Sequence, residues 1–225
     1  MKRYSILLAV AASVLALSSC LDEHPKDQLE EDKIYSTASD IYVNAVASLY
    51  NYIGGANESE GIQGTCRGIY DYNTLTTDEA IIPIRGGDWY DGGLWNAMYQ
   101  HKWTADDEPL YDTWKYIYKV IVLCNRSLDI IDARSPVGSS TPVLEDWEAK
   151  SYKAEVRAVR ALMYYEAMDM FGRVPLVLST MEQPYTLAVD GSELPQQSER
   201  SEVFRFIFSE LQDVLPFLPE DHSNK

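Results

Sequence analysis

The sequence predicts an all-α fold, in which stacked pairs of amphipathic helices are joined by long irregular loops. Apolar residues recur at the three- and four-residue spacing of helices in four long segments. Glycine and proline residues separate these segments, and no run has the strict alternation that is typical of strands. With 46% hydrophobic and 24% charged residues, the chain has the composition of a folded protein.

Residues 1–19 are predicted to be a signal peptide. Lys2 and Arg3 make its start positive, and residues 6–17 form an apolar stretch too short to span a bilayer. The following LSSC, residues 17–20, resembles the bacterial lipobox. This resemblance implies that Cys20 carries the lipid, a palmitate-type acyl chain, as the first residue of the mature protein. The alternative is a plain secretory cleavage before a structural cysteine.

Residues 20–37 are predicted to be a polar tether that becomes ordered near Ile34 and Tyr35. Asp22 and Glu23 resemble the acidic tag that directs some Bacteroidetes lipoproteins to the outer face of the outer membrane. Acyl chains hold a protein on a membrane by burying methylene groups. We therefore expect a lipid-anchored protein at the outer membrane that faces the cell surface.

The rest of the chain, residues 38–225, is predicted to be one helical region with its central helix within residues 145–178. Ala154 and Ala161 fall on one face and form a smooth strip for close helix packing, whereas Glu155 is expected on the hydrated side. Gly172 is expected to end this helix in a left-handed conformation. Because apolar residues cover more of the circumference than a surface helix needs, neighbouring helices are expected on both sides.

Three other long helices are predicted from the same spacing. They are a helix that begins at Ser39 or Asp40 and ends at Gly54 and Gly55, a helix over residues 110–132 capped by Asp106 or Asp107, and a final helix capped by Ser201. The four helices are expected to form two antiparallel pairs. No repeat of fixed length is present, so a regular solenoid is not predicted.

Residues 69–93 are predicted to be the least helical stretch and to hold the binding site. Its end reads RGGDWYDGG, in which four glycines and two acids frame an aromatic pair. Glycines allow positive φ, and an aromatic pair held in such a loop can stack on a sugar ring while Asp accepts hydroxyl protons. The candidate ligand-binding residues are Asp88, Trp89 and Tyr90, with Trp95 in a short helix predicted over residues 94–103. The alternative is that Trp89 and Tyr90 fold inward between helices.

Two cysteines remain after the lipidation site. An oxidising cell envelope permits a disulfide between Cys66 and Cys124, but the sequence does not show that they meet. Cys124 lies among apolar residues of a predicted helix, so a buried free thiol is the alternative.

The charge and the motifs exclude several classes of function. Removal of the leader leaves 17 basic and 35 acidic side chains, a net charge of −18, so nucleic acid is not an expected partner. We find no catalytic motif, no metal-ligand spacing and no cofactor signature, and therefore predict neither an enzyme nor a metal or cofactor site. The acid pairs 88/91 and 106/107 are interpreted as helix caps and turns, with glycosidase carboxylates or calcium ligands as alternatives. Arg157 and Arg160, one turn apart, are expected to pair with nearby acids.

The ordered motifs resemble the SusD/RagB family of outer-membrane nutrient-uptake lipoproteins. The segments that carry the resemblance are residues 21–28 (LDEHPKDQ), 77–79 (TDE), 85–93, 124–128 (CNRSL), 154–165, 171–177 (FGRVPLV) and 200–219. The resemblance implies tetratricopeptide-like helix pairs and a SusC-like TonB-dependent transporter as partner. It also implies capture of oligosaccharides or peptides without chemistry. Family members continue past Lys225, so we expect either a fragment or a truncated gene product.

Three functions therefore compete. The first is a glycan-binding lipoprotein that delivers oligosaccharides or other nutrients to a SusC-like transporter. The second is a surface glycosidase, which needs two carboxylates that face one cleft. The third is a helical scaffold that binds only protein or peptide. The lipobox, the aromatic segment and the family motifs favour the first.

Overall fold

The computed structural model describes residues 31–54, 61–62, 69–84, 86–87, 91–180 and 195–219. The chain divides into two units, Met1–Ile34 and Tyr35–Lys225. In the first unit, the described part is one helical turn, α2 (Glu31–Ile34), without a buried residue. The predicted signal peptide and Cys20 lie outside the described residues.

In the described part of the second unit, helices joined by irregular segments predominate, with one two-stranded sheet, which confirms the predicted all-α fold. Its elements in order are α3 (Ala38–Ile41), η1 (Tyr42–Ala47), α4 (Ser48–Gly54), α5 (Ile69–Leu75), η2 (Asp91–Gly93), α6 (Leu94–Tyr99), α7 (Glu108–Arg134), α8 (Asp146–Phe171), β1 (Val174–Pro175), β2 (Gln197–Ser198), α9 (Arg200–Val214) and η3 (Leu215–Phe217). The strands pair antiparallel, with Val174 opposite Ser198. No described helix is both long enough and apolar enough to cross a membrane.

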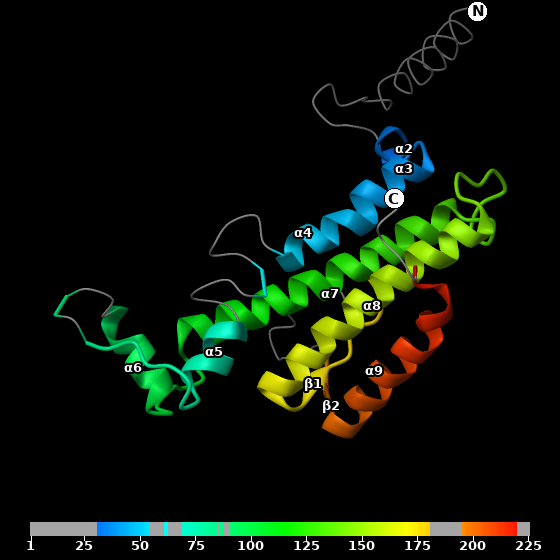
Figure 1. Ribbon diagram of the computed structural model, residues 1–225. Helices are drawn as coiled ribbons and strands as arrows, with labels where there is room; N and C mark the ends of the chain where they lie inside the picture. The colour runs from blue at the N-terminus through cyan, green and yellow to red at the C-terminus, as the bar shows by residue number, and fades with distance from the viewer. Residues whose placement is uncertain are drawn as a thin grey trace, which may run out of the picture. The chain divides into compact units, whose positions relative to one another are not determined.

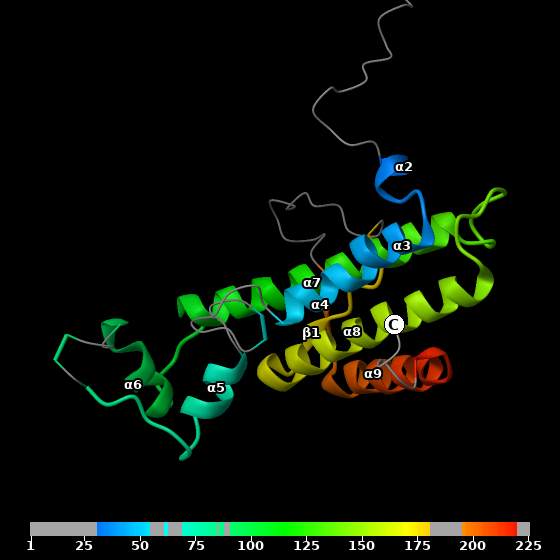
Figure 2. The ribbon, with the colours of Figure 1, turned by 45° about the horizontal axis from the view of Figure 1, so that its top comes forward.

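Helix α8 lies between α7 and α9, as Figures 1 and 2 show. The rod formed by α3, η1 and α4 runs along α7 and also contacts α8. Ala154 and Ala161 of α8 are buried, as are Val156 and Met163, so both of its flanks are covered. The expectation of neighbours on both sides of this helix is therefore confirmed. Gly172 ends α8 with φ 76° and ψ −93°, so its φ is positive as expected, but its backbone lies outside the left-handed helical conformation that was predicted.

Glu155 is the main departure from the predicted pattern of α8. It was expected on the hydrated side, but only 2% of its surface is exposed. Its Oε2 accepts hydrogen bonds from the hydroxyls of Tyr42 (3.2 Å) and Tyr50 (2.9 Å), which belong to the first rod. These partners lie more than 100 positions away in the chain, and helical periodicity carries no information about them.

Two of the predicted helix caps differ from the structure. The first helix is capped by Thr37, whose Oγ1 accepts from the Asp40 amide at 3.1 Å while the Asp40 carboxylate accepts from the Thr37 amide at 3.1 Å. The final helix is capped in the same reciprocal way by Glu199 and Glu202 rather than by Ser201. In a capping box the acid lies three residues after the cap, inside the helix. The observed caps therefore precede the predicted ones, Ser39 or Asp40 and Ser201.

The structure corrects the prediction for two short helices. Residues 69–75, expected to be the least helical, form α5, in which Ile69, Tyr72 and Leu75 are buried. Two steps of three-residue spacing are too few to give a clear periodic signal. The helix predicted over residues 94–103 ends at Tyr99 as α6, and His101 follows at φ 55°.

The thiol of Cys124 is free and fully buried in α7, which confirms the alternative of a buried cysteine. Burial raises the pKa of Cys124 to about 12, so the thiol is protonated and unreactive near neutral pH. Cys66 lies outside the described residues.

We expect Gly138→Ala to destabilise the turn between α7 and α8 by about 1–3 kcal/mol. A Cβ at this position would lie 2.1 Å from the carbonyl oxygen of Asp132, which is backbone and cannot rotate away. Thermal unfolding of purified variants measures the loss. Gly54→Ala is the matched control, because a Cβ there meets nothing within 4 Å. Equal melting temperatures for the two variants would contradict the close approach at Gly138.

Candidate functional site

The predicted site is described only at its C-terminal edge. Asp88, Trp89 and Tyr90 lie outside the described residues. The next three residues, Asp91, Gly92 and Gly93, all have positive φ (43°, 66° and 89°) and lead directly into α6. This left-handed turn explains the glycines at 92 and 93, because a Cβ disfavours that conformation.

Trp95 ties this turn to α6. Its indole Nε1 donates a hydrogen bond to the Asp91 carboxylate, and its ring packs in a small hydrophobic cluster with Tyr72, Leu75 and Met98. Only 4% of Trp95 is exposed. In this position Trp95 supports the turn. Direct contact between Trp95 and a ligand stays a prediction, which the burial of the side chain does not favour. Asp91 is likewise engaged as an acceptor within the turn, in agreement with the interpretation of this acid as a turn residue.

Around the turn, α5 and the segment from α6 to α7 expose aromatic side chains that sequence reasoning did not select. Tyr70 is 56% exposed, Tyr99 41% and Trp103 39%. The Trp103 ring lies 5.3 Å from that of His101, whose Nε2 donates to the Thr76 carbonyl at 2.6 Å. This bond joins the segment after α6 to the segment after α5. The high tyrosine and tryptophan content was the available signal, but it does not tell exposed rings from core rings.

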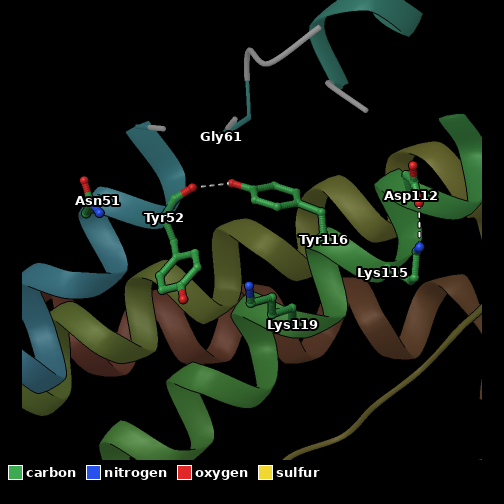
Figure 3. A pocket seen from close by; sticks show the side chains of 7 residues that line it. All are labelled: Asn51, Tyr52, Gly61, Asp112, Lys115, Tyr116 and Lys119. Atoms are coloured by element: carbon green, nitrogen blue, oxygen red, sulfur yellow. Dashed lines mark hydrogen bonds and ion pairs between the residues drawn. The ribbon is translucent and has the colours of Figure 1, made fainter. Parts of the chain in front are cut away.

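A hollow with a volume of about 540 Å³ lies between α4 and α7 (Figure 3). We call it the lysine pocket; it is lined by Asn51, Tyr52, Gly61, Asp112, Lys115, Tyr116 and Lys119. The Tyr116 hydroxyl donates to the Tyr52 carbonyl at 2.8 Å and so bridges the two helices (Figure 3). The sequence offered no signal for this pocket, because its two walls are about sixty residues apart in the chain.

The two lysines of this pocket differ in their partners. Lys115 forms an ion pair with Asp112, at 2.6 Å between Nζ and Oδ1 (Figure 3). The hydrogen bond to Asp112 raises the pKa of Lys115, so it stays charged. Lys119 places its Nζ 4.8 Å from the centre of the Tyr52 ring, a cation–π contact.

The described residues contain no group of three or more His, Cys, Asp or Glu side chains that could hold a metal ion. Of the acid pair 106/107, Asp107 precedes the first residue of α7 and accepts a hydrogen bond from the Thr104 hydroxyl at 3.0 Å. This position agrees with the interpretation of Asp107 as a helix-start residue. Arg157 and Arg160 both bind the Glu210 carboxylate, which confirms their expected pairing with acids.

Three solved structures have a fold similar to that of this chain. A SusD superfamily protein from Bacteroides thetaiotaomicron superposes with a TM-score of 0.61 at 19% identity, over 84% of this chain and 39% of that protein. A SusD-like protein from Bacteroides fragilis gives 0.62 at 20% identity, over 90% and 34%. A laminarin-binding SusD-like protein gives 0.58 at 21% identity, over 88% and 36%. The chain thus spans between about a third and two fifths of the length of these proteins.

No curated protein sequence matches the chain. A family model does: the SusD-like model described as "Starch-binding associating with outer membrane" matches residues 21–225. This match covers the whole of the described structure and all the motif segments that resembled the family. The chain therefore belongs to the SusD-like family.

Proposed function

We propose that this protein is a cell-surface glycan-binding lipoprotein, which captures oligosaccharides and passes them to a SusC-like TonB-dependent transporter. The observation that carries the proposal is the left-handed turn at Asp91–Gly93, which directly follows the Trp89–Tyr90 pair and is held by Trp95. Membership of a family described as starch-binding supports a glycan as the ligand class. Similar solved structures bear the names of a laminarin-binding protein and of a surface glycan-binding protein from Bacteroides uniformis.

The physical basis is the amphipathic surface of a sugar. One face of a pyranose ring presents C–H groups that pack on an aromatic ring, whereas its rim presents hydroxyls that need acceptors. In the proposed site, Trp89 and Tyr90 offer the ring faces and Asp88 accepts from the hydroxyls. Trp95 acts indirectly, because its bond to Asp91 keeps the turn of residues 91–93 from moving when a ligand binds.

Membrane attachment and transporter delivery are parts of the same proposal. Acylation of Cys20 would hold the protein at the outer membrane, and the tether of residues 20–37 would connect the anchor to the helical unit. Mass spectrometry of the native amino terminus tests the anchor, and co-purification with a SusC-like protein tests the delivery step. An unacylated amino terminus would contradict the anchor.

We expect Trp89→Ala to weaken glycan binding at least tenfold, which is the size of effect seen when a buried tryptophan is removed from a binding surface. Affinity electrophoresis of the purified chain against a panel that includes starch and laminarin measures the change. Trp147→Ala is the matched control, because Trp147 is 69% exposed on α8 and belongs to no predicted site. It should migrate like the unaltered protein.

Equal mobility with and without every polysaccharide would overturn the glycan-binding proposal and favour peptide capture or scaffolding. Retarded migration that Trp89→Ala leaves unchanged would place the glycan elsewhere on the surface. Release of reducing sugars by the purified protein would favour a glycosidase instead.

A further inference from the structure

We propose that the lysine pocket between α4 and α7 binds a sugar unit that carries a negative charge, either a carboxylate or a sulfate ester. The inference rests on the proposed function in one respect, that the ligand is a glycan. It concerns a different set of residues, however, because the seven described residues that line the pocket are Gly61 and residues of α4 and α7.

The first argument is the local charge. The chain as a whole has a net charge of −16, yet among the described residues that line the pocket there are two lysines and one aspartate. Asp112 already compensates Lys115. Within the described part of the chain Lys119 forms no ion pair, and its ammonium group contacts the face of Tyr52. The positive charge of Lys119 therefore remains available to attract an anion to this pocket, although the net negative charge of the protein repels anions elsewhere.

The second argument is the chemistry of the lining. Tyr52 is 38% exposed and offers an aromatic face, and Asn51 offers both an amide donor and an amide acceptor. A bare anion would use only Lys119. An anionic sugar would use all of these groups, with its apolar face on the tyrosine ring and its charge against the ammonium group.

The third argument is that Lys119 can leave the Tyr52 ring. A cation–π contact on an exposed surface is weaker than a charge-assisted hydrogen bond between an ammonium group and a carboxylate or sulfate. The flexible four-carbon stem of lysine allows the ammonium group to swing from the ring to an arriving anion, which frees the ring face for the sugar. The volume of about 540 Å³ lies within the range of small-ligand sites.

The test is isothermal titration of the purified 225-residue chain with matched oligosaccharides: oligogalacturonate, its carboxyl-reduced neutral counterpart and a sulfated galactan oligosaccharide. We expect at least one anionic ligand to bind at least tenfold more tightly than the neutral one, with an affinity that falls as salt is raised. Binding of the uronate alone assigns the charge as a carboxylate, and binding of the sulfated ligand alone assigns it as a sulfate ester.

Variants connect this preference to the pocket. Lys119→Met keeps the apolar stem and should remove the tenfold preference, whereas Lys119→Arg should retain most of it. Lys150→Met is the matched control, because it changes the net charge equally at an exposed lysine of α8 outside the lysine pocket. Because Lys119 is exposed, all three variants should keep the melting temperature of the unaltered protein.

The two proposals fail in different ways. If neutral glycans bind and Trp89→Ala abolishes that binding, but anionic ligands gain nothing or Lys119→Met changes nothing, the lysine pocket is wrong and the proposed function stands. If no glycan binds, neutral or anionic, both proposals are overturned. If anionic ligands bind through Lys119 while neutral ones do not bind at all, the pocket stands and the aromatic segment is wrong.

Discussion

Replacement of Glu210 by alanine is expected to lower the free energy of unfolding by about 3–5 kcal/mol, the usual cost of breaking a buried ion pair from one side. Glu210 of α9 is 8% exposed. Its carboxylate accepts from Arg157 Nε, which lies 3.1 Å from each oxygen, from Arg157 Nη2 at 2.6 Å and from Arg160 Nη2 at 2.8 Å. Without it, Arg160, itself 6% exposed, would keep its contact with Asn125 but lose its carboxylate. A buried guanidinium without an anion is the source of the cost.

Urea unfolding at pH 7 measures this loss. Arg173→Ala is the matched control, because its ion pair with Glu199 spans 3.5 Å on the surface, with both side chains more than 60% exposed. The control should change the free energy of unfolding by less than about 1 kcal/mol. Similar losses for the two variants would contradict a special role of the buried network.

The same carboxylate should make stability depend on pH. Burial by itself would raise the pKa of Glu210, but the hydrogen bonds from Arg157 and Arg160 outweigh it and hold the pKa below the ordinary value of 4.5. A carboxyl with a lowered pKa in the folded state stabilises fully above its unfolded value and loses that contribution as pH falls through its folded value. The difference between the unaltered protein and Glu210→Ala should therefore be constant near neutrality and shrink below pH 4.5.

The second large effect is expected in the apolar core. Ile121 of α7 is fully buried in the main core cluster, together with Ile117, Val156 and Met163. Ile121→Ala should lower the free energy of unfolding by about 2–5 kcal/mol, through lost burial and the cavity left behind. Denaturant unfolding followed by circular dichroism measures it, with an unchanged denaturant slope as evidence that the fold is retained.

A graded series makes this prediction sharper. Ile121→Val removes one methyl group and should cost about 0.5–1.5 kcal/mol. Val137→Ala, at a position that is 88% exposed in the loop between α7 and α8, should change stability by no more than about 0.5 kcal/mol. If Ile121→Ala behaved like Val137→Ala, the core position of this α7 face would be wrong.

What the sequence alone determined is the set of long helices and the central place of α8. Their apolar spacing extends over many turns, and Gly172 is a local stop signal, so each depends only on residues close by in the chain. The family was also predicted from the sequence, because several short motifs in a fixed order are specific together even where each one is weak. The caps of the first and final helices were missed by two or three residues, since a capping box is recognised from its acid as much as from its cap, whereas Asp107 does precede α7.

The tertiary structure alone decided which polar side chains are buried and where the pockets lie. Glu155 meets Tyr42 and Tyr50, Glu210 meets two arginines about fifty positions away, and the lysine pocket joins α4 to α7. Each of these depends on how separate helices pack against each other. Periodicity within one helix reports which face is apolar, but it does not identify the partner that the polar residues on that face will meet.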